Sequence, residues 1–594
     1  MSSPPQPPAT ASPGEVYTSR LAARRAEQQR LARRHALLSG WHRLLLGTLV
    51  LLIILVEKEG LVAKLVFIGG PALLLGDLIT RRARVAQLVR EHRWMADLYQ
   101  QRLACVEDRW PGTGEPGTRY LGPDHPAAAD LDLFGVGGLF ERMTMPCTRA
   151  GEDTLAGWLL APAGAVEARE RQAAVAELRG RLDLREHLAL LASHVAASSD
   201  LPHVAHWGQA AAVFTSPAAR GLGALTLALT VVALLGGLVF HTGTAPVLIA
   251  LGLQAAFAIT LRRRANAVLG PLEKHPYDLA ALGRLFARLE SEHFSSPRLV
   301  QLRANLICGR ASRQTVWLNH LRRWAPLAPM LASRPQMAIL LDCWRQASVP
   351  AFARWLHALG EIEALCALAA YSYECPGDPF PEILDAGTVF EAEGLGHPLL
   401  PQARCVRNDV ALGDGGTRLL IISGSNMAGK STLLRAAGVN AALALAGAPV
   451  RACRLRIAPL TVGATLRIQD SLLAGRSRFQ AEILRVRRLL EMAKGLPPLL
   501  FLLDELFQGT NSADRRIGAD AVLRQLVDAG AIGLVTTHDL ALTEIGDRLD
   551  DRAANCHFED HFDNGEITFD YRMRPGVVRH SNGLALMRAV GIEV

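Results

Sequence analysis

The stretch RLLIISGSNMAGKSTLLRAAGVNAALALA, residues 418–446, decides the fold of the C-terminal part of this chain. It reads as an apolar strand, a loop with a glycine at each end and an apolar helix, and the loop matches G-x-x-x-x-G-K-[ST]. A chance glycine-rich turn would not need this strand–loop–helix context. Glycines let backbone N–H groups converge on phosphate, and the helix N-terminus adds partial positive charge. We therefore expect a phosphate-binding loop formed by Gly424, Ser425, Asn426, Met427, Ala428, Gly429, Lys430, Ser431 and Thr432.

Two further strands are expected to carry the catalytic groups. In the loop itself, Lys430 would reach the β- and γ-phosphates of ATP and Ser431 would hold Mg²⁺. The segment LLFLLDELFQGT, residues 499–510, is an apolar strand that ends in two acids. Asp504 would hold Mg²⁺ through water, and Glu505 would orient or deprotonate the attacking water. Adjacent carboxylates can also be a solvated strand end, but the apolar run directly before them disfavours that alternative.

The strand AIGLVTTHD, residues 531–539, brings a histidine to the same region. Parallel sheets bind ligands at the carboxyl ends of their strands, and His538 follows such an end. We expect His538 to sense the γ-phosphate as a catalytic residue. The alternative is an ordinary surface histidine.

Composition gives weaker evidence about the compartment and the partners. The 594 residues are half apolar and carry a formal net charge of +8, a small excess for this length that suits nucleic acid or anionic lipid. Nine cysteines include no C-x-x-C pair, which argues against a zinc site and favours a reducing compartment.

Four apolar runs predict two membrane hairpins, at 36–80 and 216–262. The runs are Leu44–Val56, Leu61–Ile79, Gly221–Phe240 and Thr244–Leu261. About 20 apolar residues are needed to cross a bilayer, so the first two runs are the weaker pair. Arginines flank both hairpins and the loops EKEG and HTG carry no positive excess, so both hairpins should start and end in the cytoplasm. Core helices are the alternative for each pair. The first apolar run starts too far from the N-terminus for a cleaved signal peptide, and it lacks a small-residue cleavage site.

The rest of the chain divides into regions that differ in composition and expected secondary structure. Residues 1–35 are expected to be a disordered or basic N-terminal tail, in which 1–18 are disordered and are followed by a basic helical stretch with Arg20, Arg24, Arg25, Arg30, Arg33 and Arg34. Residues 81–215 are expected to be a helical core-like region, and 263–380 a helical lever or core region. From about 381 to 594, short β-branched strands alternate with helices, as in an α/β domain with a mostly parallel sheet. The boundary falls at the proline-rich stretch CPGDPFPE, which starts at Cys375.

Several of these motifs resemble the DNA mismatch-repair MutS family. They include GSNMAGKST, LLDELFQGTNSADR, TTHD, VRNDVAL at 406–412, GHPLL at 396–400, DSLLAGRSRFQAE at 470–482 and RPGVVRHSNGLALMRAVGI at 574–592. The resemblance covers about 385–594 and extends more weakly to 130–195. It implies ATP and Mg²⁺ as cofactors and a homodimer formed through the ATPase domains. In that dimer Ser477 would act on the partner subunit's nucleotide, while Val406 and Tyr571 would contact adenine.

The expected fold class is therefore α+β and multidomain. A helical core and lever region with two transmembrane hairpins precedes a C-terminal α/β P-loop ATPase domain of the kind found in ABC and MutS proteins. The expected function is ATP-driven dimer closure coupled to binding of mismatched or otherwise abnormal duplex DNA, in a multi-pass membrane protein whose ATPase domain is cytoplasmic. The partners would be a second copy of the chain, duplex DNA and the lipid bilayer.

Departures from the family pattern keep two alternatives open. The mismatch-reading N-terminal domain has no counterpart, and a DNA clamp would have to fit into 267–370. One alternative is a transporter-like ATPase, although transporters carry LSGGQ where this chain has LAGRSRF. The other is a membrane-bound scaffold whose ATP cycle gates a protein partner without any role for DNA.

Overall fold

The computed structural model has two compact units, which are described separately. Unit 1 comprises residues 1–114 with 373–375, and unit 2 comprises 115–372 with 376–594. The structure describes residues 11–56, 58, 60–122, 125–145, 147–196, 211–240, 243–274, 279–324, 334–425, 427–467, 478–508, 510–563 and 566–578.

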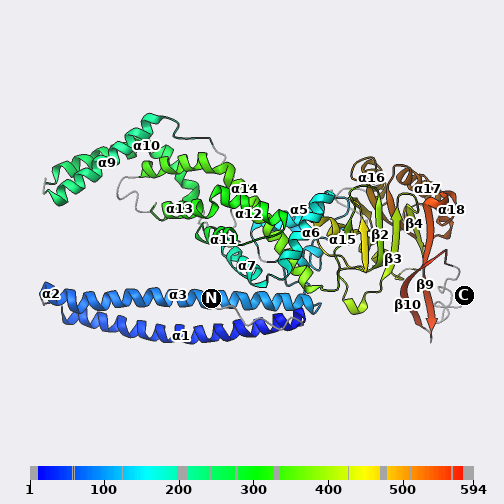
Figure 1. Ribbon diagram of the computed structural model, residues 1–594, viewed down its shortest axis with the longest axis horizontal. Coiled ribbons are helices and arrows are strands. Elements are labelled where there is room, and N and C mark those ends of the chain that lie inside the picture. Colours follow the sequence, from blue (N-terminus) through cyan, green and yellow to red (C-terminus); the bar gives the residue numbers. More distant parts are fainter. Residues whose placement is uncertain are drawn as a thin grey trace. The chain divides into compact units, whose positions relative to one another are not determined.

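Unit 1 is a long helical hairpin (Figure 1). Its arms are α1 (Pro13–Leu55) and a second arm made of α2 (Leu61–Lys64), the π-helical turn η1 (Leu65–Gly69) and α3 (Gly70–Val106). The basic stretch after residue 18 is helical as expected, but residues 13–18 differ from the expected disordered segment because they belong to α1. The physical reason is a capping box: Ser12 Oγ accepts from Glu15 N–H and the Glu15 carboxylate accepts from Ser12 N–H, which satisfies two otherwise free donors of the first turn.

A buried polar cluster holds the end of unit 1 opposite its turn. Arg102 donates to both carboxylate oxygens of Glu374 at 2.6 and 2.7 Å, and Tyr17 donates to the same carboxylate at 3.3 Å. Arg20 donates to Tyr99 Oη at 3.1 Å. Both members of the Arg102–Glu374 pair are buried, so loss of one partner would leave an uncompensated charge at a cost of about 3–5 kcal/mol.

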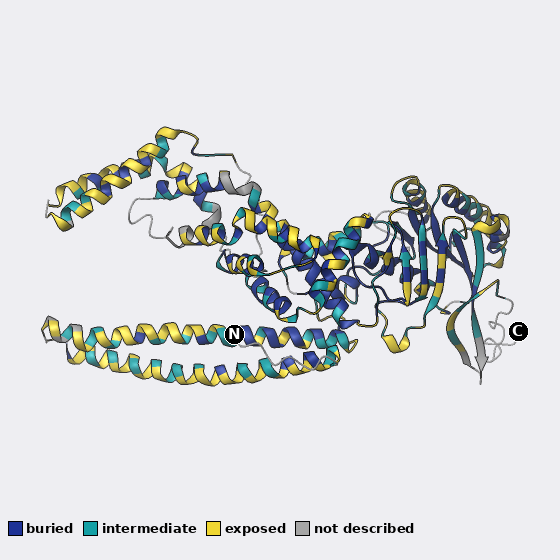
Figure 2. Ribbon diagram, viewed as in Figure 1, coloured by how far each residue is buried: buried dark blue, intermediate teal, exposed yellow. Residues whose placement is uncertain are grey.

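The turn end of the same hairpin exposes its apolar side chains. Figure 2 shows the exposed surface running along both arms. Large apolar residues that are more than half exposed include Leu44, Leu51, Ile54, Leu55, Val62, Val66, Phe67, Leu73 and Leu74. Such a surface is rare on a soluble protein and marks a lipid or partner contact.

The first part of unit 2 is helical. Its elements are η2 (Thr118–Tyr120), α4 (Leu139–Met143), α5 (Arg149–Leu160), α6 (Ala165–Arg179), α7 (Leu182–Ala196), α9 (Pro217–Val239), α10 (Ala245–Lys274), α11 (Leu279–Ser291), α12 (Pro297–Gly309), α13 (Ala311–Trp324) and α14 (Arg334–Glu374). Helix α14 begins beside α9, where Gln336 donates to Gly223 O and Thr226 Oγ1. Farther along α14, the Glu363 carboxylate accepts from Thr148 N–H and Oγ1 at the start of α5.

Three helices in the described part of the chain are long and apolar enough to cross a membrane. They are α1, α9 over Pro217–Gly237 and α10 over Ala245–Gly270. The remaining apolar run, Leu61–Ile79, is also helical, but it is divided among α2, the π-helical turn η1 and α3. Helices α9 and α10 pack against each other, expose most of their leucines and bury the polar side chains of Thr226, Thr230 and Gln254.

The C-terminal part of unit 2 is an α/β domain with two sheets. One has the order β1 (Glu382–Ile383), β5 (Arg454–Ile457), β2 (Val389–Leu395) and β3 (Asn408–Gly413). The other has the order β10 (Glu566–Pro575), β9 (Ala553–Asp563), β4 (Leu419–Ser423), β8 (Ile532–Thr537), β7 (Leu499–Asp504) and β6 (Thr461–Thr465). All neighbours in this second sheet are parallel except β9 and β10, which pair antiparallel. The expected helical region followed by an α/β domain is confirmed, and the sheets are mixed.

Helices cover both faces of the larger sheet. Side chains from alternate positions, such as Leu419, Phe501 and Leu503, pack with α16 (Arg478–Met492) and α17 (Ser512–Asp528). On the other face, Leu502 lies against Gly438 of α15 (Lys430–Ala446). Because both faces are covered, the central strands read as continuous apolar runs. Short elements complete the domain: η3 (Gln402–Arg404), η4 (Leu540–Leu542), α18 (Glu544–Arg548) and η5 (Asp550–Arg552).

Candidate nucleotide-binding site

The carboxyl ends of three neighbouring parallel strands bring the expected site residues together. Strand β8 lies between β4 and β7, with Ser423 opposite Thr537 and Asp504 opposite Thr536. The loop after β4, the two acids at the end of β7 and His538 after β8 therefore meet at one edge of the sheet. This is the edge where open parallel sheets bind ligands.

The loop between β4 and α15 has the backbone that its glycines predict. Gly424 and Gly429 have φ of 144° and 104°, a region that favours glycine. At Gly424 a Cβ atom would lie 2.8 Å from Phe558 O, so no larger residue fits. Met427 also has a positive φ, 71°, and an exposed side chain, whereas Ala428 is buried. Asn426 lies outside the described residues.

Lys430 directs a buried positive charge into this loop. Its Nζ donates to the carbonyl oxygens of Gly424 at 2.6 Å and Ser425 at 3.0 Å, and lies 3.9 Å from Glu505 Oε1. Burial lowers the pKa of Lys430, while the carboxylates of Glu505 and Asp504 oppose that shift. The Ser425 hydroxyl is also buried and has no hydrogen-bond partner among the described residues. A buried ammonium beside an unpartnered hydroxyl suits an anionic ligand with many acceptor oxygens.

The acids and the histidine form a second group at the same edge. The Thr536 hydroxyl donates to Asp504, and Glu505 N–H donates to Thr536 O at 3.2 Å. Glu505 has a φ of 49°, which is rare outside glycine and turns its side chain away from the strand direction. Its Oε1 lies 3.4 Å from His538 Nδ1 and 3.9 Å from Lys430 Nζ. The Glu505 carboxylate therefore lies between the Lys430 ammonium and the His538 ring.

Ser431 and Asp504 fit a magnesium ion that retains water. Ser431 lies in the first turn of α15, directly after Lys430. No group of three or more His, Cys, Asp or Glu residues in the described part of the chain can hold a metal by itself. Mg²⁺ usually binds through one or two protein oxygens, several waters and the phosphates of its substrate. One hydroxyl and one carboxylate match that ligand set.

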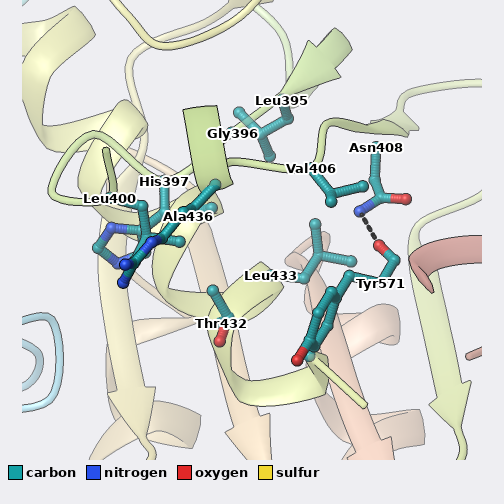
Figure 3. Close-up of a pocket in the computed structure, with 12 residues that line it drawn as sticks. Leu395, Gly396, His397, Leu400, Val406, Asn408, Thr432, Leu433, Ala436 and Tyr571 are labelled. Carbon is teal, nitrogen blue, oxygen red and sulfur yellow. Dashed lines mark hydrogen bonds between the residues drawn. The ribbon is translucent and has the colours of Figure 1, made fainter. Parts of the chain in front are cut away.

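A pocket of about 450 Å³ adjoins the loop (Figure 3). Val406 and Tyr571 both line it, together with Gly429 and Thr432. Asn408 holds Tyr571 in place, because its side-chain nitrogen donates to Tyr571 O at 3.0 Å and its Oδ1 accepts from Met573 N–H at 2.7 Å. The structure thus places both expected adenine contacts in one pocket beside the phosphate loop.

The pocket contains residues that the sequence patterns did not single out. His397 is nearly buried there, and burial lowers its pKa to about 4, with the positive charge of Arg435 acting in the same direction. At neutral pH His397 is therefore uncharged where it lines the pocket. His397 and Asn408 both lie in motifs quoted above, GHPLL and VRNDVAL, so their position within those motifs was the signal that could have identified them.

The remaining predicted site residue, Ser477, lies outside the described residues.

The family comparison agrees with this geometry. Residues 420–593 match the model of MutS domain V. The C-terminal part of this chain is therefore similar to the MutS family. This confirms the resemblance over residues 420–593, and the weaker resemblance of 130–195 stays a prediction.

Individual MutS relatives each align with 39–40% of the chain. A DNA mismatch repair protein MutS 2 of Halobacterium salinarum is 33% identical over 239 residues, which are 39% of this chain and 27% of that protein. A DNA mismatch repair protein MSH3 of Phaeosphaeria nodorum is 32% identical over 39% of this chain and 21% of its own length. A DNA mismatch repair protein MutS of Natronomonas pharaonis is 32% identical over 40% of this chain and 27% of its own length. The chain thus spans about a quarter of the length of these relatives.

Proposed function

We propose that this protein is a Mg²⁺-dependent ATPase of the MutS type. The observation that carries the proposal is the meeting of Lys430, Asp504, Glu505 and His538 at one sheet edge, beside a pocket that can take an adenine base. The domain V match is consistent with this activity. ATP is the substrate, and ADP and phosphate are the products.

Backbone and lysine together bind the triphosphate. The N–H groups of residues 424–430 and the Nζ of Lys430 contact the phosphate oxygens, and Lys430 exchanges its bonds to loop carbonyls for stronger charge-assisted ones. Ser431, and Asp504 through water, would hold Mg²⁺, which would neutralise phosphate charge. The adenine ring would contact Val406 and Tyr571, and Asn408 fixes the backbone of Tyr571 by donating to its carbonyl oxygen.

Glu505 is the residue that activates water. It orients the attacking water and accepts its proton as the water oxygen attacks the γ-phosphorus and the bond to the β-phosphate oxygen breaks. His538 lies within 3.4 Å of the Glu505 carboxylate and reaches the side of the γ-phosphate. In a homodimer formed through the ATPase domains, Ser477 of each chain contacts the partner's nucleotide, so both chains are needed to complete each site.

Glu505→Gln should keep ATP binding and reduce turnover by about 10²–10³-fold, the loss typical of one catalytic proton-transfer or electrostatic group. The amide fills the same space but cannot accept the proton. Nucleotide affinity and phosphate release are measured on the same purified protein. Glu544→Gln, an exposed acid on α18, is the matched control and should behave as the parent. Unchanged hydrolysis in Glu505→Gln would show that another group activates water.

We also propose that two helical hairpins anchor the protein in a membrane. Support comes from the length and apolar composition of α1, α9 and α10 and from the exposed leucines of α9 and α10. The 19 residues from Gly221 to Val239 would span about 28 Å as helix, close to the roughly 30 Å of a bilayer core. Exposed Arg262, Arg263 and Arg264 follow the apolar part of α10 and suit anionic headgroups on the cytoplasmic side.

A reporter inserted in the turn at 241–244 should give an extracytoplasmic signal, because both ends of the α9–α10 hairpin carry arginine and should stay in the cytoplasm. The same reporter fused after residue 594 should give a cytoplasmic signal. The measurement is a pair of compartment-specific reporters at each position. A cytoplasmic signal from the 241–244 turn would mean that α9 and α10 are core helices of a peripheral protein.

DNA is the proposed effector of the ATPase, since the matching relatives are named as DNA mismatch repair proteins. In the helical region several arginines are already engaged: Arg298 pairs with Glu361, and Arg303 donates to Glu290 O. Arg284, Arg310 and Arg313 are exposed in the same region and are available for phosphate contacts.

Hydrolysis by the full chain in detergent is therefore expected to change at least twofold with mismatched duplex DNA, relative to matched duplex. The effect should weaken steeply as salt rises, because phosphate contacts release counterions. Mismatched, matched and branched duplexes are compared at low and physiological salt. If none of them changes the rate or binds at low salt, the ATP cycle serves a protein partner at the membrane instead.

A further inference from the structure

The turn after β7 carries two residues other than glycine in a left-handed backbone. Glu505 has a φ of 49° and Phe507 a φ of 59°. Such a backbone is unfavourable for a residue that has a Cβ atom, and it persists only where the surrounding structure holds it. Glu505 is the residue to which we assign water activation. The groups that hold this turn therefore also fix the direction of its carboxylate.

Phe507 is held through its backbone and through its ring. Its N–H donates to the carboxylate of Glu482, a buried residue of α16. Its carbonyl oxygen accepts from Arg515 Nε at 3.2 Å. Its ring packs edge-on against Phe479, and a Cβ on Gly518 of α17 would lie 3.3 Å from the ring. Both α16 and α17 therefore contribute to the conformation of the turn.

Arg515 folds back from the first turn of α17 onto the same turn. Besides its bond to Phe507 O, its Nη2 donates to Gln508 O at 3.4 Å and to Thr510 O at 3.3 Å. The side chain of Asn511 caps α17 by accepting a backbone N–H three residues on, at 2.9 Å, which fixes the start of the helix from which Arg515 projects. One guanidinium thus joins three carbonyl oxygens of the turn.

Helix stability does not account for an arginine at this place. The N-terminus of a helix carries partial positive charge, so a cation in the first turn of α17 is disfavoured. The donors of Arg515 go to carbonyl oxygens of the turn rather than to a carboxylate. A guanidinium is planar and presents its donors in a rigid fork, which lets it fix several acceptors at once. The contribution of Arg515 is therefore the geometry of the turn.

The geometry of this turn reaches the nucleotide site through Glu505. Glu505 is two residues before Phe507, and its carboxylate lies 3.9 Å from Lys430 Nζ and 3.4 Å from His538 Nδ1. If the Phe507 backbone relaxed to an ordinary conformation, the peptide groups before it would rotate and the carboxylate would leave this position. A displacement of about 1 Å at a catalytic group can cost on the order of a hundredfold in rate.

We propose that Arg515 is a positioning residue for ATP hydrolysis, which fixes the left-handed turn at Phe507 and through it the carboxylate of Glu505. The inference rests on the proposed function, because it takes Glu505 as the residue that activates water. It adds a residue outside the catalytic groups that sets the rate of the chemical step and leaves the affinity for nucleotide unchanged.

A double-mutant cycle between Arg515→Ala and Glu505→Gln tests this on the full chain in detergent. The single-turnover rate with radiolabelled ATP and the dissociation constant for ATP are measured for the parent, both single variants and the double variant. In the parent background, Arg515→Ala should lower the rate about tenfold or more at an unchanged dissociation constant, as for a displaced catalytic group. In the Glu505→Gln background it should change the rate less than about twofold, because no carboxylate is left to position.

Two further variants complete the experiment. Arg516→Ala is the matched control: Arg516 is the next residue of α17, is exposed and lies 3.8 Å from Glu544, so its loss should leave rate and affinity within about twofold of the parent. Arg515→Lys keeps a charged donor without the fork, so it should lose less than the alanine variant. If the alanine variant does not fold, the lysine variant carries the same cycle.

Other outcomes overturn the inference in distinguishable ways. Equal losses from Arg515→Ala in both backgrounds mean that Arg515 acts independently of Glu505, and weaker ATP binding means that it supports the nucleotide pocket. No loss in the parent background means that the turn does not need the arginine. A loss as large from Arg516→Ala means a general effect on α17. Unchanged hydrolysis in Glu505→Gln alone would instead contradict the proposed water activation, and the inference with it.

Discussion

A buried lysine ammonium is the constraint on which the site depends. Lys430 is almost fully buried, its bonds go to two loop carbonyls, and the nearest carboxylate oxygen lies 3.9 Å away. A charge taken out of water is costly unless it is well paired, and here burial lowers the pKa of the amine. Triphosphate oxygens would supply the missing pairing. The glycines with positive φ, the sheet edge and the acids of β7 all hold this charge where such a ligand can reach it.

The helical part of the chain is joined to that charge by contacts on α15. Leu131 packs on Gly438, Asp132 lies near Arg435, and Asn440 of the same helix accepts from Arg451 N–H at 2.7 Å. Arg451 in turn pairs with Asp378, just after the 41-residue helix α14. The other end of α14 contacts the apolar helix α9 through Gln336. One helix therefore connects the region next to the nucleotide site with a hairpin that suits a membrane.

Local patterns predicted which residues the structure brings together at the sheet edge, because each pattern depends on residues close together in the chain. The phosphate loop, the acids Asp504 and Glu505 and His538 each follow a strand, and parallel pairing brings strand ends to one edge. Tyr571 and Val406 came from the family resemblance and do line one pocket. The contact between Asp132 and Arg467 could not be predicted, since the two residues are 335 positions apart in the chain. The first helical residues, 13–18, were missed because they continue a tail that is rich in proline, serine and alanine.

Affinity for ATP in the Lys430→Ala protein tests the central claim most directly. Calorimetric or fluorescent-nucleotide titration of the full chain in detergent gives the dissociation constant for the parent and the variant. Loss of a charge-assisted bond of about 1.5–3 kcal/mol should weaken binding by roughly ten- to a hundredfold. If the variant binds ATP as tightly as the parent, triphosphate is not held at this loop and the account is contradicted.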